Sequence, residues 1–89
     1  MIVRMWEATV AAGRLEDATE WVRRDLVPRA LHAPGCLAAE ILIHEGTPES
    51  IVLITRWDVA PVFEEGWPDD ECLTRARAQH LQTLRPELG

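Results

Sequence analysis

The chain has 89 residues and a formal net charge of −6, from 15 acidic and nine basic residues. A domain of this size buries only about 60% of the surface that its unfolded chain exposes, so its core is small. The acidic residues are spread along the sequence and would repel a polyanion, which argues against DNA or RNA as a partner. We therefore predict one domain over residues 1–89 that binds no nucleic acid.

Cysteine and histidine usage gives no support for a disulfide framework or a metal centre. The two cysteines, Cys36 and Cys72, have no CxxC spacing, and the three histidines are scattered. Neither GxGxxG nor a Walker A loop occurs, so we expect no nucleotide cofactor. No apolar run is long enough to span a bilayer, and no signal-peptide pattern opens the sequence. These features predict a cytoplasmic protein without a membrane partner, a metal or another cofactor.

The first predicted element is a strand over residues 2–11, rich in Val, Ile, Thr and Trp. The alternation of side chains places Arg4 and Trp6 on one face of this strand. A guanidinium beside an indole suits a flat aromatic ligand that carries an anionic or carbonyl oxygen. The alternative is that Trp6 packs in the sheet with Arg4 at its rim.

The second predicted element is an amphipathic helix over residues 14–31. Apolar residues recur there at helical spacing, and charged residues fall on the opposite side. Pro28 has no amide hydrogen to donate, so the regular helix is expected to kink or end near residues 25–27.

Two apolar runs, residues 36–45 and 50–58, follow on either side of a short turn. The turn is too short for a crossover connection, which predicts an antiparallel hairpin. Both runs are apolar on both faces, as expected for a sheet that is covered from two sides. The helices of so short a chain can cover one face, so a second copy of the protein is expected to cover the other.

Two helical segments are predicted after the hairpin. Pro61 suits an early helical position and predicts a short helix to about Glu65. Acidic residues 69–71 would then begin a last helix that ends near Leu84, because negative charge is favourable at a helix N-terminus. The predicted order is β-α-β-β-α, a ferredoxin-like α+β fold with an antiparallel sheet, helices on one face and a missing or vestigial fourth strand.

Candidate polar residues lie on the predicted last helix, where His80 shares an apolar stripe with Cys72 and Ala76. A histidine can act as a general base near neutral pH, and a core or interface histidine is the alternative. Arg77 flanks the stripe and could orient an enolate or phenolate oxygen, or else lie exposed.

The order of elements and a few short motifs resemble the antibiotic biosynthesis monooxygenase family. The motifs are a proline late in the first helix, Pro34-Gly35 before the second strand, and Ile54-Thr55-Arg56-Trp57-Asp58 at the end of the third. Members of this family are ferredoxin-like dimeric α+β barrels. The resemblance covers about residues 1–80 and implies a homodimer with a small aromatic molecule between two sheets. It also implies that Trp57 borders the pocket, with plain packing as the alternative.

The resemblance implies a cofactor-independent monooxygenase that acts on a polycyclic aromatic, polyketide-type substrate. In such chemistry the deprotonated substrate itself reduces O2, and the protein supplies a dry pocket, a base and a group that stabilises the oxyanion. The residues expected to do this are His80 as the base, Arg77 or Arg4 at the oxyanion, and Trp57, Trp6 and Thr55 around the substrate.

Two alternatives remain open because the quinone-forming members use Asn and Tyr side chains, which this chain lacks. A haem-degrading relative would pair a helix-two histidine with a tryptophan and a strand-one asparagine. His80 and Trp67 suit the first two, but Met5-Trp6-Glu7 stands where the asparagine is expected. The other alternative is a non-catalytic, dimeric ligand-binding or accessory module of a biosynthetic pathway.

Overall fold

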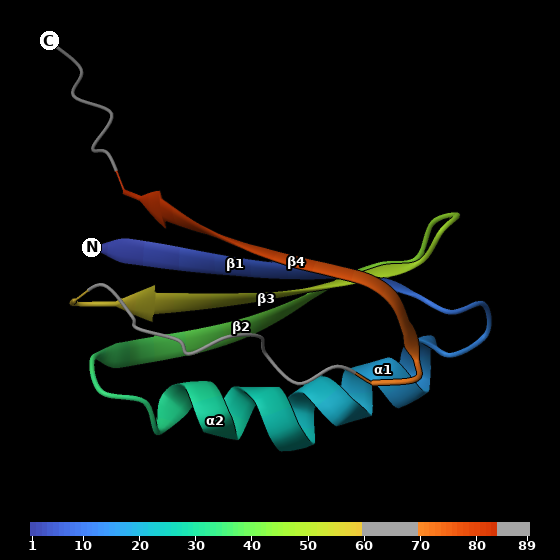
Figure 1. The fold of residues 1–89 in the computed structure, drawn as a ribbon, viewed down its shortest axis with the longest axis horizontal. Helices are drawn as coiled ribbons and strands as arrows, with labels where there is room; N and C mark the ends of the chain where they lie inside the picture. The colour runs from blue at the N-terminus through green and yellow to red at the C-terminus, as the bar shows by residue number, and fades with distance from the viewer. Residues whose placement is uncertain (60–69, 84–89) are drawn as a thin grey trace, which may run out of the picture.

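A computed structural model describes residues 1–59 and 70–83 of the chain. Four strands form one antiparallel sheet in the order β2-β3-β1-β4. Their bounds are Ile2–Val10 for β1, Cys36–His44 for β2, Ser50–Trp57 for β3 and Leu73–Gln82 for β4. The helical layer lies below β2 and β3 in Figure 1, whereas β4 forms the opposite edge of the sheet. The predicted α+β class and antiparallel hairpin are confirmed.

One helical rod connects β1 to β2, and its regular geometry changes just before Pro28. The rod consists of α1 over Leu15–Trp21, a π-helical turn η1 over Val22–Leu26, and α2 over Val27–Leu31. In the π-helical turn the Val27 amide donates to the Val22 carbonyl, five residues back. Pro28 lies in the first turn of α2, where its missing amide hydrogen costs least. The predicted interruption is confirmed, although the chain stays helical through it.

The fourth strand corrects two of the sequence-based predictions. Residues 73–82 were expected in a helix and form β4 instead, so the missing or vestigial fourth strand is also wrong. Arg, Ala, Gln and Leu favour a helix in isolation. Pairing with β1 along the whole of β4 overrides that preference, and the alternation in Arg75-Ala76-Arg77-Ala78 fits a strand. The short helix predicted over residues 61–65 lies outside the described residues.

The far end of β4 is fastened to the start of the chain. The Thr83 amide and the Thr83 hydroxyl both donate to the Met1 carbonyl, at 3.1 and 3.0 Å. These bonds continue the β1–β4 ladder by one residue and hold β4 in register beside β1.

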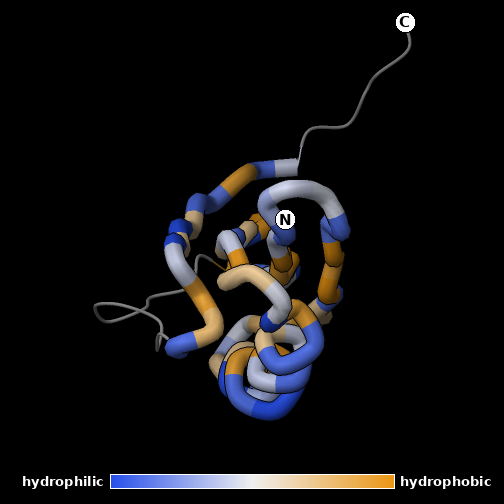
Figure 2. Tube along the Cα trace, turned by 90° about the vertical axis from the view of Figure 1, so that its right-hand side faces the viewer, coloured by the Kyte–Doolittle hydropathy of each residue, from blue (hydrophilic) through white to orange (hydrophobic). Residues whose placement is uncertain are grey.

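The core lies between the helical rod and one face of the sheet. The two central strands turn alternate residues toward the rod. The buried residues of the strands and the rod include Trp6, Ala8, Val10, Ala18, Val22, Leu26, Ile51 and Leu53. The rings of Trp6 and Trp21 lie 6.2 Å apart at 51°, a tilted aromatic contact. Figure 2 shows hydrophilic residues along the outer rim of the rod, away from the strands. The predicted amphipathic helix is confirmed.

No described helix packs against the other face of the sheet, which we call the open face. Strand alternation assigns to it the apolar side chains of Val3, Met5, Leu42, Val52, Ile54 and Leu81. Leu42 is 44% exposed and Leu81 45% exposed. Glu40 is exposed on this face of β2.

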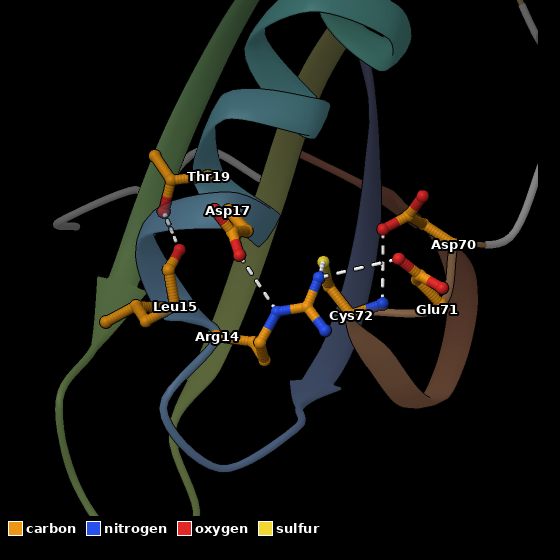
Figure 3. Close-up of polar contacts among 7 residues, drawn as sticks. All are labelled: Arg14, Leu15, Asp17, Thr19, Asp70, Glu71 and Cys72. Carbon is orange, nitrogen blue, oxygen red and sulfur yellow. Dashed lines mark hydrogen bonds and ion pairs between the residues drawn. The ribbon is translucent and has the colours of Figure 1, made fainter.

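A polar cluster fastens the beginning of β4 to the turn before α1 (Figure 3). Arg14 Nε donates to Asp17 Oδ2 at 2.8 Å, and Arg14 Nη2 lies 3.1 Å from Sγ of buried Cys72 and 3.6 Å from Glu71 Oε1. The Asp70 carboxylate accepts from the Cys72 amide at 3.1 Å. Hydrogen bonds from Cys72 lower the pKa of Asp70, and the hydrogen bond to Asp70 raises the pKa of the Cys72 thiol.

Asp70→Asn is expected to lower the free energy of unfolding at neutral pH by at most about 1 kcal/mol, because solvent screens this partly exposed carboxylate. A carboxyl whose pKa is lowered by folding stabilises the fold above its unfolded pKa of about 3.9. That stabilisation is lost as the pH falls through the folded value, so the variant and the wild type should converge in acid. Thermal unfolding over a pH series measures the difference, with Asp25→Asn on the exposed side of η1 as the control. A difference that persists in acid would contradict an ionic origin.

Candidate functional site

A row of three side chains crosses the sheet on the side that faces the helical rod. Arg4 of β1 is the cross-strand neighbour of Thr55 on β3 and of His80 on β4. Arg4 Nη1 lies 2.9 Å from His80 Nε2. Thr55 is 1% exposed and Arg4 8%, whereas His80 is exposed. We call these three residues the Arg4 row, and it leads from the core to the solvent.

The contact between Arg4 and His80 fixes the state of the imidazole. A guanidinium has donors only, so His80 Nε2 must be the acceptor and the proton of the neutral ring must be on Nδ1.

Burial has a cost at Arg4, and it lowers the pKa of the guanidinium through desolvation. The ordinary pKa of a guanidinium lies so far above neutrality that the side chain keeps its charge. A buried cation is stabilised by hydrogen bonds and by nearby negative charge. The Arg4 row therefore places a cation at the edge of an apolar core, a setting that favours an anionic oxygen of a ligand.

Trp57 lies behind the Arg4 row and is fully buried, with 0% of its surface exposed. Its indole Nε1 donates to Thr55 Oγ1 at 2.8 Å, and the Thr55 hydroxyl makes a long contact of 3.5 Å with the Arg4 carbonyl. An indole without exposed surface offers no face to a ligand in this conformation. Its geometry matches the packing alternative, with Trp57 holding Thr55 beside Arg4.

Trp6 shares the face of Arg4, as the strand alternation predicted. It is 3% exposed and packs in the core, with Trp21 as its aromatic neighbour. Its cross-strand neighbour on β4 is Ala78. Ala76, Ala78 and His80 form an exposed strip along this side of β4, and we call it the β4 strip. The two alanines themselves place only methyl groups above the strand beside Trp6.

Arg77 does not join His80, although the sequence-based helix placed them together. The two residues are three positions apart in a strand, so they fall on opposite faces of the sheet. Arg77 lies on the open face, where Nε and Nη2 lie 3.1 and 3.0 Å from Glu7 Oε1. A shallow hollow of about 270 Å³ lies there, lined by Glu7, Thr9, Arg75, Ala76 and Arg77. The expected partnership of Arg77 with His80 at one oxyanion is not supported by this placement.

Within residues 1–59 and 70–83, no three His, Cys, Asp or Glu side chains gather in a way that could hold a metal ion. In the same part of the chain, no helix is long and apolar enough to cross a membrane.

Comparison by sequence gives no relative: no protein-family profile matches the chain, and no curated protein does. Comparison of folds is informative. A candidate antibiotic biosynthesis monooxygenase from Bordetella bronchiseptica matches with a TM-score of 0.72 and 18% identity, over 94% of this chain and 97% of that one. This chain has the antibiotic biosynthesis monooxygenase fold. A second candidate monooxygenase of that name, from Bacillus cereus, matches with a TM-score of 0.67 and 12% identity, over 100% of this chain and 96% of the other.

A third structure with the antibiotic biosynthesis monooxygenase fold is a variant of MhuD with two manganese protoporphyrin IX molecules bound per active site. It matches with a TM-score of 0.67 and 15% identity, over 100% of both chains. At such identities the comparisons establish the fold alone, and the resemblance noted from the sequence is confirmed at that level.

The pairing of Arg4 with His80 was missed because His80 was expected in a helix. Both residues were candidates, but a His80 in a helix beside the sheet would have no fixed position relative to Arg4 in the strand. The available signal was the period of two in residues 74–80, in which Arg75, Arg77 and Gln79 alternate with smaller residues and His80.

Thr55→Val is expected to destabilise the fold by about 1–3 kcal/mol, because it removes the hydroxyl that accepts from the buried Trp57 indole. Thr55→Ser keeps the hydroxyl and loses one methyl group, so it should cost only about 1 kcal/mol. Urea unfolding followed by tryptophan fluorescence compares the two. A Val variant as stable as the Ser variant would show that this hydrogen bond contributes nothing measurable.

Proposed function

We propose that this protein is a member of the antibiotic biosynthesis monooxygenase family that binds a flat aromatic compound with an ionisable oxygen. The observation that carries the proposal is the 2.9 Å contact between Arg4 and exposed His80 in a chain with this fold. His80 Nε2 has a lone pair to take a proton, and Arg4 has a charge to hold the oxygen that loses it.

The proposed reaction needs no cofactor. His80 takes a proton from the substrate, and the electron-rich anion that remains is held by Arg4 while it reacts with O2. For an anthrone-type substrate, one oxygen atom replaces the two hydrogens of a CH2 group as a carbonyl, and the other leaves as water. The protein supplies the base and the cation, and the buried position of Arg4 at the edge of the apolar core strengthens its attraction for the oxyanion.

The proposed ligand position is beside the β4 strip, whereas the sequence analysis expected it between two sheets. Arg4, Thr55 and His80 share the side of the helical rod, and a partner sheet would cover the opposite side. Trp6 and Trp57 then support the site from the core, and Arg77 has no part in it. The polyketide origin of the substrate and a cytoplasmic location stay predictions from the sequence.

The open face is the proposed contact with a second copy of the chain. Its apolar side chains occupy all four strands, and Leu42 and Leu81 alone leave 44% and 45% of their surfaces exposed. A symmetric pair of such faces would bury these side chains against each other.

Ile54→Arg is expected to convert the dimer to a folded monomer. Ile54 lies near the middle of the open face, next to Met5 and Glu40, so a cation there would be buried in a dimer and could pair with Glu40 in a monomer. Asp25→Arg on the exposed side of η1 is the matched control and should stay dimeric. Sedimentation velocity at micromolar concentration reads out the mass. A wild-type protein that sediments as a monomer of 10.1 kDa would refute the dimer.

The oxygenase activity is tested by oxygen uptake with anthrone-type substrates under air. His80→Ala is expected to lower the rate by about 10²–10⁴-fold, the usual contribution of a general base. His44→Ala is the control, because His44 lies exposed at the end of β2 on the open side of the sheet. Uptake that is unchanged by His80→Ala would remove His80 as the base, and no uptake by the wild type with any such substrate would favour a non-catalytic binding module.

The haem-degrading function remains a second candidate because the porphyrin-bound MhuD variant shares the fold over the full length of both chains. Two features of this chain oppose it. His80 lies on a strand instead of the second helix, and β1 has Met5-Trp6-Glu7 where the asparagine is expected. Trp67 lies outside the described residues. A titration with haem, followed by the Soret band, distinguishes this function from the first.

A further inference from the structure

We propose that Arg4 blocks the proposed base until the ligand arrives, so that the site selects ligands with an acidic hydroxyl group, phenols or enols. This inference rests on the function proposed above and specifies which ligands that site accepts. It follows from the geometry of the Arg4 row. There an N–H group of Arg4 occupies the lone pair on Nε2 of His80, the only ring lone pair that could accept a proton.

The base role assigned to His80 cannot be filled while its contact with Arg4 lasts. With Arg4 Nη1 2.9 Å from His80 Nε2, that nitrogen has no lone pair for a substrate proton. Nδ1 cannot replace it, because it bears the proton of the neutral ring. If Nε2 were protonated instead, two donors would face each other at this distance. The Arg4–His80 contact must therefore break before His80 can work as a base.

A hydroxyl group can break this contact and satisfy both partners in one step. The ligand O–H proton moves to His80 Nε2, and the oxygen keeps the electron pair as an oxyanion. Arg4 Nη1 transfers its hydrogen bond from Nε2 to that oxyanion, and the new Nε2–H donates to the same atom. One bond to hydrogen forms and one breaks, and the negative charge lies between the two cations that would otherwise repel each other.

Other oxygen groups satisfy only half of the site. An ether has no proton for His80, so Arg4 has no oxyanion to move to. A carboxylate that arrives ionised would attract Arg4 but would leave Nε2 without a proton donor. A phenol or enol satisfies both, and the alanines of the β4 strip leave room for its ring next to the exposed His80.

The test uses 4-nitrophenol and its methyl ether 4-nitroanisole, in which a methyl group replaces the ionisable proton. The nitrophenol should bind the wild type about tenfold more tightly than the ether, as one charge-assisted hydrogen bond at an exposed site allows. It should also turn yellow on binding at a pH where the free compound is mostly un-ionised. Arg4→Met should abolish both the preference and the colour, because it keeps an apolar stem and removes the donors.

A second measurement applies to the protein without ligand. Nitrogen-15 NMR of the wild type should show His80 with an unprotonated Nε2 and a protonated Nδ1, and Arg4→Met should remove this fixed tautomer. If Arg4→Met does not fold, His80→Gln serves in its place, since His80 is exposed, and it should also abolish the colour. His44→Gln is the matched control and should behave as the wild type does.

Equal binding of the two compounds by the wild type, or a proton on His80 Nε2 in the absence of ligand, would overturn the proposal. Neither probe has a CH2 group to oxidise, so these results do not depend on turnover. A protein that ionises nitrophenol but takes up no oxygen would keep this inference and lose the oxygenase function. Oxygen uptake without selection for the phenol would overturn this inference and keep the oxygenase function.

Discussion

The candidate site depends on one constraint, the central position of β1 between β3 and β4 in the sheet. Because β1 is paired on both sides, Arg4 has a fixed neighbour on each, Thr55 toward the core and His80 toward the solvent. The row joins residues 51 and 76 positions apart in the sequence. Neither the charge of Arg4 nor the imidazole of His80 would be near the other if β4 paired elsewhere.

The two faces of the sheet carry different kinds of residues. The face toward the helical rod holds the core and the Arg4 row, and the tryptophans there serve mainly as packing behind the polar residues. The open face carries exposed apolar side chains and is the proposed partner contact, with the Glu7–Arg77 pair on the same side. Separation of the two faces allows the proposed ligand site and the proposed dimer contact to be altered independently.

The sequence predicted the elements whose hydrophobic pattern is strong. β1, the helical rod and the β2–β3 hairpin were found within one or two residues, because their apolar residues recur at the period of a strand or a helix. β4 was missed although residues 74–80 alternate with a period of two, because alanine on one side and arginine and glutamine on the other give no row of large apolar residues that would mark a core-facing strand. Its residues favour a helix locally, and only pairing with β1 makes it a strand. The contact of Arg4 with His80, and that of Arg14 with Cys72, depend on this pairing and were out of reach for the same reason.

The bonds from Thr83 to the Met1 carbonyl have a practical consequence for the handling of this protein. They lie three residues beyond His80 and anchor an edge strand that has no second neighbour within the described sheet. Edge strands loosen first at their ends, where local opening costs little free energy. Loss of Met1, or a bulky group attached next to it, would act directly on this anchor, so an affinity tag is better placed elsewhere when the imidazole of His80 is to be studied.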